Sequence, residues 1–134
     1  MHVYKDKPRR KKKSNNNIIY HIPCMDCCSF YIGQTSKDLK VRINQHKYSV
    51  RTGQTSNALF VHLSEQSHRI NWSQSTVIAR CNNFHSRNIL ESAIIQITSE
   101  ENCNLSPGQF SLDPLILNSF KKDLKEIISK VSVN

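Results

Sequence analysis

The stretch IIYHIPCMDCCSFYIGQT, residues 18–35, decides the fold of this 134-residue chain. Two short runs within it, residues 18–22 and 30–33, are rich in β-branched and aromatic side chains, as β-strands are. The turn-like segment Pro-Cys-Met-Asp-Cys-Cys joins them, so the stretch predicts a β-hairpin with a long loop. Its three cysteines could carry the chemistry, as metal ligands or nucleophiles, or they could hold the two tyrosines in place.

The residues that follow the hairpin predict an amphipathic helix. Ser36 is a candidate helix cap, and the helix is expected to end at Gly53. Leu39, Ile43 and Val50 recur at helical spacing between these two positions, so they predict one apolar face.

Further elements follow along the chain. Residues 57–63 predict a short helix, and residues 76–81 predict a third strand. Ser86 is a candidate cap for a strongly apolar helix with a face made of Ile89, Leu90, Ala93, Ile94 and Ile97. Residues 102–114 are rich in Asn, Ser, Pro and Gly and predict a loop. A C-terminal amphipathic helix is predicted from apolar residues in steps of three and four, namely Leu117, Phe120, Leu124, Ile127 or Ile128, and Val131.

This order of elements predicts a small α+β domain with a three-stranded antiparallel sheet flanked by helices. Residues 1–16 are expected to form a basic flexible lead-in, residues 17–114 the domain, and residues 115–134 the C-terminal helix. The chain is long enough for one domain with a real core and too short for two ordinary ones.

Positive charge is concentrated at the N-terminus. The chain has a net charge of +9, and residues 1–13 hold seven Lys or Arg and one acid, whereas residues 14–134 hold twelve Lys or Arg and nine acids. The run PRRKKK, residues 8–13, therefore supplies most of the imbalance. Such a run is typical of a nuclear-import signal or of an arm that contacts phosphates, and a solvated linker is the alternative.

Composition excludes some classes of protein. No apolar run approaches the roughly 20 residues that span a bilayer, so we do not expect this chain to be an integral membrane protein. No apolar stretch follows the basic N-terminus, so a secretory signal is not expected. Five cysteines are an odd number, which favours metal-bound or free thiols in a reducing compartment over a disulfide framework.

Four side chains have the chemistry to act on a phosphodiester. Arg42 and His46 are four residues apart and therefore share one helix face, where a guanidinium and an imidazole can hold a phosphate and move a proton near neutral pH. Tyr20 and Tyr31 are expected on neighbouring strands, so both hydroxyls can reach one place on the sheet. Ordinary packing is the alternative for each tyrosine.

Glu91 is the most informative acid in the chain. It is expected to open a helix with almost wholly apolar following turns, where an unused carboxylate is unusual. A single carboxylate with waters and substrate oxygens is how Mg²⁺ is often held. The alternative is an exposed acid favoured by the helix dipole, worth under about 1 kcal/mol.

The cysteines and histidines have metal-ligand spacing. Cys24-x-x-Cys27 has the spacing of a zinc knuckle, and His62-x₅-His68 is the other plausible pair. The thirty-four residues between Cys27 and His62 exceed the roughly 12–15 of a DNA-reading finger, so the metal would be a clip that fastens the hairpin loop. Free thiols and surface histidines are the alternative, and Cys28 is the alternative partner in the cysteine pair.

Four motifs occur in order along the chain, namely Ile18-Ile19-Tyr20, Tyr31-Ile32-Gly33-Gln34-Thr35, Leu39-x-x-Arg42-x-x-x-His46 and Leu90-Glu91-Ser92. In this layout, over residues 17–113, the chain resembles the GIY-YIG nucleases. The chain carries the motif IPC-x-x-C-x-x-x-YIGQT and a CCHH ligand set. In these two features it resembles most closely the endonuclease domain of Penelope-like retroelements. One departure is Ile18, which stands where the family's first motif has glycine.

The resemblance implies a role for each residue. Glu91 would hold the catalytic Mg²⁺ or Mn²⁺, and Arg42 would stabilise charge on the phosphorane. Tyr20, together with His46, would activate or orient the attacking water. The remaining positions implied are Tyr31 for positioning water or phosphate, Gly33 for close approach of a phosphate, Asn104 (or Asn102) as the late asparagine, and Cys24, Cys27, His62 and His68 for structural Zn²⁺.

The resemblance also implies a setting. The chain would nick target DNA in the nucleus and leave a 3′-hydroxyl for the reverse transcriptase domain of the same element. A non-cleaving, zinc-stabilised nucleic-acid-binding module is the alternative, although its sequence is expected to lose Arg42 or Glu91. A repair or restriction GIY-YIG nuclease is a second alternative, which the ligands between the two tyrosines disfavour. Oligomeric state and target preference do not follow from the sequence.

Overall fold

A three-stranded antiparallel sheet organises the chain in the computed structural model, which describes the backbone of residues 15–132 and the side chains of residues 15–127. The strands are β1 (Ile18–Pro23), β2 (Phe30–Thr35) and β3 (Thr76–Arg80), in the spatial order β2-β1-β3. Both pairings are antiparallel. The predicted α+β class and three-stranded sheet are therefore confirmed.

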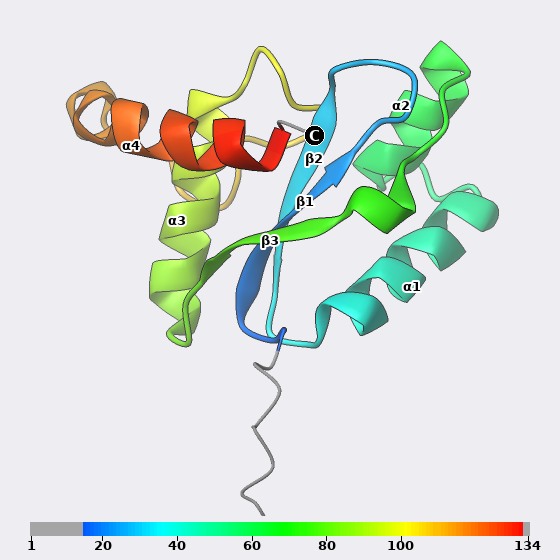
Figure 1. Ribbon diagram of the computed structural model, residues 1–134, viewed down its shortest axis with the longest axis horizontal. Helices are drawn as coiled ribbons and strands as arrows, with labels where there is room; N and C mark the ends of the chain where they lie inside the picture. The colour runs from blue at the N-terminus through cyan, green and yellow to red at the C-terminus, as the bar shows by residue number, and fades with distance from the viewer. Residues whose placement is uncertain (1–14, 133–134) are drawn as a thin grey trace, which may run out of the picture.

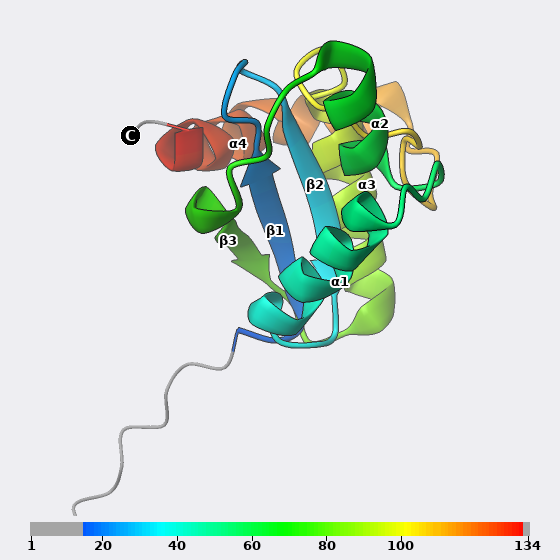
Figure 2. The same cartoon turned by 90° about the vertical axis from the view of Figure 1, so that its right-hand side faces the viewer.

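Helices cover both faces of the sheet (Figures 1 and 2). One face packs against α1 (Leu39–Arg51) and α2 (Ala58–Gln66), and the other packs against α3 (Phe84–Ile97) and α4 (Pro114–Ser132). A short 3-10 helix, η1 (Trp72–Gln74), precedes β3 and was not predicted. Among the described residues, no helix is long and apolar enough to cross a membrane.

The side chains of β1 point alternately to the two faces of the sheet and contribute to two separate hydrophobic cores. Ile19 faces α3 and α4, where it joins a cluster with Ile32 and Leu124. Ile18, Tyr20 and Ile22 face α1 and α2 and join the second cluster. Successive side chains of a strand point to opposite faces, so a central strand that is buried on both sides has no polar face.

Two helices begin at different residues from those predicted. Asp38, not Ser36, caps α1, because its Oδ1 accepts a hydrogen bond from Lys40 N at 2.9 Å. Asn83, not Ser86, caps α3, because its Oδ1 accepts from Ser86 N at 2.9 Å. Asp, Asn and Ser are similarly good caps, so local sequence does not choose between neighbouring candidates. The earlier start of α3 moves Glu91 from the expected helix start to the middle of the helix.

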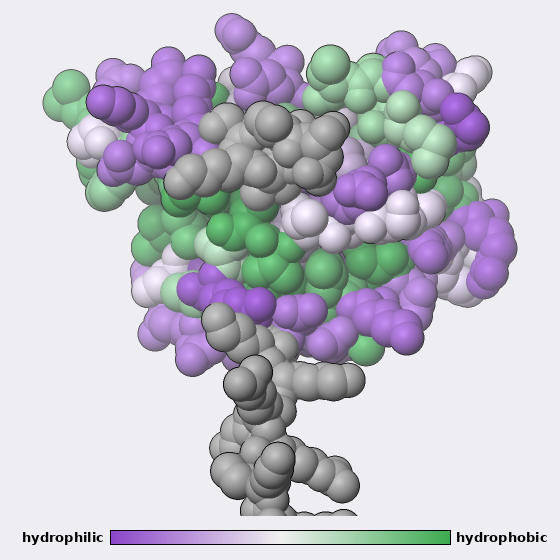
Figure 3. Space-filling model, in the orientation of Figure 1, coloured by the Kyte–Doolittle hydropathy of each residue, from purple (hydrophilic) through white to green (hydrophobic). Residues whose placement is uncertain are grey.

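The two edges of the sheet differ. A bulge between Ile19 and Tyr20 interrupts the pairing of β1 with β3, and bulges of this kind bend an edge strand and discourage further pairing. Figure 3 shows apolar residues gathered over β3, below α4. The edge of β2 is covered instead, because Phe30 O accepts from Cys103 N at 2.8 Å.

The described end of the lead-in is held against the domain. Asn15 O accepts from Leu39 N at 2.9 Å, and Asn17 O accepts from Cys81 N at 2.9 Å. The expected flexibility therefore does not extend to residues 15–17. The basic run at residues 8–13 and the side chains of Ile128 and Val131 lie outside the described part.

His21 is a buried histidine whose ring nitrogens have no hydrogen-bond partner. Burial lowers its pKa from 6.5 to about 4. The unfolded chain therefore binds a proton that the folded chain does not between these two pH values, so stability present above pH 6.5 is lost as the pH falls towards 4. We expect His21→Leu to remove this loss. The difference in unfolding free energy between variant and wild type should grow by about 2 kcal/mol from pH 7.5 to pH 5.

Urea unfolding of both zinc-loaded proteins at several pH values measures this difference. Zinc ligands also bind protons in the same range, but that contribution is common to both proteins and cancels. Parallel stability curves would show that His21 does not titrate as its burial requires.

Candidate functional site

Five of the predicted site residues meet at one polar cleft of about 500 Å³, lined in part by Tyr31, Arg42, His46, Glu91 and Asn104. The residues that line the cleft come in part from β2, α1 and α3, and Figure 2 shows α1 and α3 on opposite sides of the outer strand β2. Polar side chains of residues 49–57 and 104–109 complete its walls. Residues from separate motifs therefore come together where a backbone edge and two helices converge.

Two tyrosine rings pack over Gly33 beside this cleft. Tyr20 pairs with Gly33 in the sheet register, and the ring centroids of Tyr20 and Tyr31 are 6.2 Å apart. The space that a Cβ at Gly33 would need is filled by the Tyr20 ring, and Tyr31 Cε1 is 2.8 Å away from it. A glycine is therefore required at this position so that both rings can pack on one spot of the strand.

Tyr20 is wholly buried and lies behind the cleft. Its hydroxyl is 2.7 Å from His46 Nε2, and His46 in turn contacts Tyr31 with ring centroids 5.1 Å apart. Burial, with a smaller contribution from Tyr31, raises the pKa of Tyr20 above its ordinary value. Tyr20 is therefore a neutral phenol near pH 7, connected to the cleft through His46.

His46 is held in its neutral form. It is 2% exposed, and burial, together with the positive charge of Arg42, lowers its pKa to about 3. Its second ring nitrogen, Nδ1, is 3.2 Å from Asn57 Nδ2 at the start of α2. Both ring nitrogens are thus engaged, so the imidazole is fixed in the wall of the cleft.

Glu91 is a half-buried carboxylate in the middle of α3 and reaches the cleft. Burial raises its pKa to about 7, while the Gln34 backbone N–H and the Arg42 guanidinium act in the opposite direction. The helix dipole does not explain an acid so far from the helix start. A desolvated carboxylate in a polar cleft is a fitting ligand for a divalent cation, which would compensate its charge.

Arg42 is the cation of the cleft. Its Nη1 donates to Gln45 Oε1 at 3.1 Å, one turn further along α1. No carboxylate of the described residues forms a salt bridge with it. The guanidinium of Arg42 therefore keeps donors available for an anion.

A buried arginine that the sequence did not single out sets the position of α3. Arg87 Nε donates to Gln34 Oε1 at 2.9 Å, and Gln34 Nε2 donates to Asn88 Oδ1 at 3.2 Å. Arg87 and Asn88 lie one turn before Glu91, so these bonds dock the helix with Glu91 directed at the cleft. Gln34 in the YIGQT motif thus helps to hold α3 in position.

Asn104 completes the edge of β2. Its Oδ1 accepts from Ile32 N at 3.0 Å, and its Nδ2 donates to Ile32 O at 2.7 Å. One carboxamide thereby replaces a neighbouring strand at the cleft. Asn102, the alternative residue, instead donates to Ile95 O and Thr98 O at the end of α3. Of the two, Asn104 is the asparagine at the cleft.

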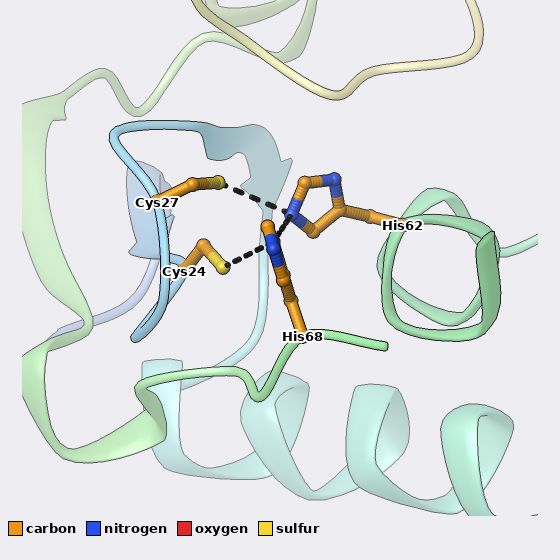
Figure 4. A group of neighbouring side chains, drawn as sticks. All are labelled: Cys24, Cys27, His62 and His68. Atoms are coloured by element: carbon orange, nitrogen blue, oxygen red, sulfur yellow. Dashed lines mark hydrogen bonds between the residues drawn. The ribbon is translucent and has the colours of Figure 1, made fainter. Parts of the chain in front are cut away.

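A second site contains Cys24, Cys27, His62 and His68, and their ligand atoms all lie within 4.8 Å of one another. Figure 4 shows the two cysteines on the loop between β1 and β2, His62 on α2, and His68 just after it. Cys24 Sγ is 3.6 Å from His68 Nδ1, Cys27 Sγ is 3.5 Å from His62 Nε2, and the two nitrogens are 3.3 Å apart. This group can hold a metal such as zinc.

These three distances match the corresponding edges of a tetrahedral zinc site. A tetrahedral zinc with Zn–S about 2.3 Å and Zn–N about 2.0–2.1 Å has S–N edges of about 3.5–3.6 Å and N–N edges of about 3.3–3.4 Å. Asp26 N donates to Cys24 Sγ and Ser29 N donates to Cys27 Sγ, both at 3.4 Å. Burial raises the pKa of the Cys24 thiol, while the bond from the Asp26 N–H acts in the opposite direction. Cys28 is exposed and does not belong to the group.

The loop and the segment that follows α2 are held together beside the cluster. Met25 N donates to Arg69 O at 2.8 Å, and Asn71 N donates to Pro23 O at 2.9 Å. Arg69 also forms an exposed salt bridge with Asp26 at 3.0 Å. A metal would therefore join two segments that already lie side by side.

Sequence reasoning missed Asn57, Gln34 and Arg87 as contributors to the site. Asn57 carries a helix-cap signal, and the buried charge of Arg87 has no periodic signal at all. Comparisons of the chain with protein-family models, with curated proteins and with solved structures return no match.

Proposed function

We propose that this chain is a metal-dependent DNA endonuclease of the GIY-YIG type, stabilised by structural Zn²⁺. The observation that carries the proposal is the convergence of Tyr31, Arg42, His46 and Glu91 on one polar cleft. These residues come from three separate elements, and each has the chemistry that phosphodiester hydrolysis requires. The likeness of the four motifs to those of Penelope-like endonucleases points to the same reaction.

Each of these residues has its own proposed role in hydrolysis. Arg42 stabilises the negative charge that develops on the phosphate oxygens in the transition state. Tyr20, with His46, activates or orients the attacking water, and Tyr31 positions water or phosphate. Glu91 would hold Mg²⁺ or Mn²⁺, which supplies positive charge beside the scissile phosphate when it is bound.

The bond changes define the products. The oxygen of water forms a bond to phosphorus, the bond between phosphorus and the 3′-oxygen breaks, and the 3′-oxygen takes up a proton. One strand then carries a 3′-hydroxyl and the other piece a 5′-phosphate. A 3′-hydroxyl is a primer for a polymerase, so this product suits a domain that acts with a reverse transcriptase.

Positive charge beside the cleft supports DNA as the partner. Residues 37–51, which form α1 and the turn before it, hold five Lys or Arg and one acid. The other residues of 14–134 hold seven Lys or Arg and eight acids. The positive charge of the folded part is therefore gathered on the helix that also presents Arg42 and His46, where it can contact phosphates on either side of the scissile bond.

Basic residues of α1 lie beside two aromatic rings, Tyr48 of α1 and Trp72 of η1. Lys47 Nζ lies 5.9 Å from the centroid of the Trp72 ring, and Arg51 Cζ lies 5.6 Å from the centroid of the Tyr48 ring. Tyr48 is 55% exposed. Trp72 is partly buried, so Arg51 beside the exposed Tyr48 ring is the pair that suits contacts with phosphates and unstacked bases.

The setting is part of the proposal. Zn²⁺ is the metal we propose for the cysteine–histidine cluster, since its donor set and spacing suit tetrahedral zinc. The reverse transcriptase domain of the same retroelement is the proposed protein partner. The nucleus is the proposed location, because the target DNA and the basic run at residues 8–13 both point there.

Nicking of a supercoiled plasmid tests the proposal. We expect the zinc-loaded chain to convert the plasmid to open circles when Mg²⁺ or Mn²⁺ is added and to do so only slowly without them. The nicked product should be extended by a DNA polymerase without prior phosphatase treatment, because the end is a 3′-hydroxyl. Arg42→Ala should nick about 10²-fold more slowly, and it controls for contaminating nucleases.

Two outcomes would contradict the assignment. One is a parent chain that nicks nothing with either metal, and the other is an Arg42→Ala variant that nicks at the parent's rate. A parent that binds plasmid DNA without nicking it would instead favour the non-cleaving, zinc-stabilised nucleic-acid-binding module.

A further inference from the structure

The side-chain amide of Asn57 has a fixed orientation at the start of α2. Its Oδ1 accepts hydrogen bonds from Leu59 N at 2.9 Å and from Phe60 N at 3.3 Å. These are the bonds of a helix N-cap, in which the side-chain oxygen accepts from backbone donors of the first turn. The oxygen is thereby assigned, so the other end of the amide is the NH₂ group.

That NH₂ group faces the imidazole of His46. Asn57 Nδ2 is 3.2 Å from His46 Nδ1. The amide nitrogen can only donate, so Nδ1 must accept and carries no hydrogen. A neutral imidazole has one N–H, and burial together with Arg42 keeps this ring neutral by lowering its pKa to about 3. The hydrogen is therefore on Nε2.

The position of this hydrogen determines the direction of the next bond. His46 Nε2 is 2.7 Å from Tyr20 Oη, so the N–H donates and the phenol oxygen accepts. Nε2 then has no lone pair with which to take a proton from Tyr20. The hydroxyl hydrogen of Tyr20 is then not shared with His46.

We propose that Asn57 is a positioning residue, which holds His46 in the Nε2-protonated tautomer so that His46 donates to Tyr20 and does not receive its proton. The catalytic meaning rests on the proposed nuclease function. Within it, Tyr20 stays a neutral phenol that fixes His46 in the wall of the cleft, and the Tyr20–His46 pair does not serve as a proton-accepting relay. Asn57 thus uses one amide group both to cap α2 and to set the direction of the hydrogen bond between His46 and Tyr20.

Asn57→Asp is the informative substitution, because Asp and Asn are similarly good helix caps. An aspartate would keep the oxygen that accepts from Leu59 N and Phe60 N, but it would replace the NH₂ group with a second acceptor. His46 must then carry a hydrogen on Nδ1 to satisfy that acceptor. Asn57→Ser is the matched control, since serine also caps helices but is too short to contact His46.

Nitrogen-15 NMR of the histidine rings of the zinc-loaded protein measures the tautomer directly. The signals of His46 among the six histidines are assigned by their loss in His46→Gln. We expect an unprotonated Nδ1 and a protonated Nε2 in the wild type, and a protonated Nδ1 in Asn57→Asp. A wild-type ring protonated on Nδ1, or an unchanged ring in Asn57→Asp, would overturn the tautomer assignment.

The plasmid assay then measures the role in nicking. Asn57→Asp should nick about 10²-fold more slowly than the wild type, the usual size of a correctly placed proton or hydrogen bond in acid–base catalysis. Asn57→Ser, which does not force the hydrogen onto Nδ1, should stay within about tenfold. Both variants should unfold within about 1 kcal/mol of the wild type.

The outcomes separate this inference from the nuclease assignment. If Asn57→Asp nicks as fast as Asn57→Ser, the positioning role is wrong even if the wild type is a nuclease. If the wild type nicks nothing, the nuclease assignment fails, and the NMR spectra still decide which nitrogen of His46 carries the hydrogen.

Discussion

Loss of the metal from the cysteine–histidine cluster is expected to unfold the part of the chain that carries the cleft. Cys24→Ser, which removes one ligand, should lower the melting temperature by roughly 10–15 °C or more, because structural zinc contributes several kcal/mol to folding. Two backbone hydrogen bonds and the exposed salt bridge of Arg69 with Asp26 also hold the loop, but few of its side chains are buried, since Met25 is 49% exposed and Cys28 is exposed.

Calorimetry and elemental analysis together measure this effect. Cys28→Ser is the matched control, because it removes a neighbouring thiol that lies outside the cluster. It should keep one zinc per chain and unfold within about 0.5 kcal/mol of the wild type. Equal zinc content in Cys24→Ser and Cys28→Ser would show that the ligand set is wrong, and a zinc-free wild type that melts normally would show that the cluster has no structural role.

Glu91→Gln is expected to abolish nicking while leaving the fold intact. The substitution keeps the shape of the side chain and removes its charge, so it removes the carboxylate that would hold the catalytic cation. We expect the nicking rate to fall by at least about 10³-fold, as when the main source of transition-state charge stabilisation is lost. Burial raises the pKa of Glu91 to about 7, so the ionised carboxyl is unfavourable in the folded protein without a cation.

The stability of this variant distinguishes a site residue from a packing residue. Glu91→Gln should be no less stable than the wild type when no Mg²⁺ is added, because it removes a desolvated charge. Urea unfolding at pH 8 measures this, and the plasmid assay measures the loss of nicking. A variant that nicks like the wild type, or that loses activity only because it unfolds, would remove Glu91 from the proposed mechanism.

The hairpin and the helices were predictable because their patterns are strong. The β-branched and aromatic runs around the cysteine loop gave β1 and β2, and Leu39, Ile43 and Val50 gave the inner face of α1. The predicted starts of α1 and α3 were wrong because Ser, Asp and Asn cap helices almost equally well. Tertiary bonds, such as that of Arg87 with Gln34, fix where α3 docks, and no local pattern encodes them.

The site was predictable where spacing along one element decides it. Arg42 and His46 share a helix face because they are four residues apart, and the cysteine pair and the histidine pair have metal-ligand spacing. Contacts between elements could not be derived in this way. The approach of Asn57 to His46 depends on how α2 packs on α1, and the pairing of Asn104 with Ile32 depends on where the last loop crosses the edge of β2.

Metal binding at the cysteine–histidine cluster would also cross-link the chain. By joining Cys24 and Cys27 to His62 and His68, a bound ion closes a ring of backbone that contains β2 and α1. Arg42 and His46 lie inside this ring, whereas Glu91 belongs to a segment that docks on it from outside. The cleft thus lies between the segment that a bound ion would cross-link and the flanking chain, so an ion would fix the wall that carries Arg42 and His46, whereas non-covalent packing holds the wall that carries Glu91.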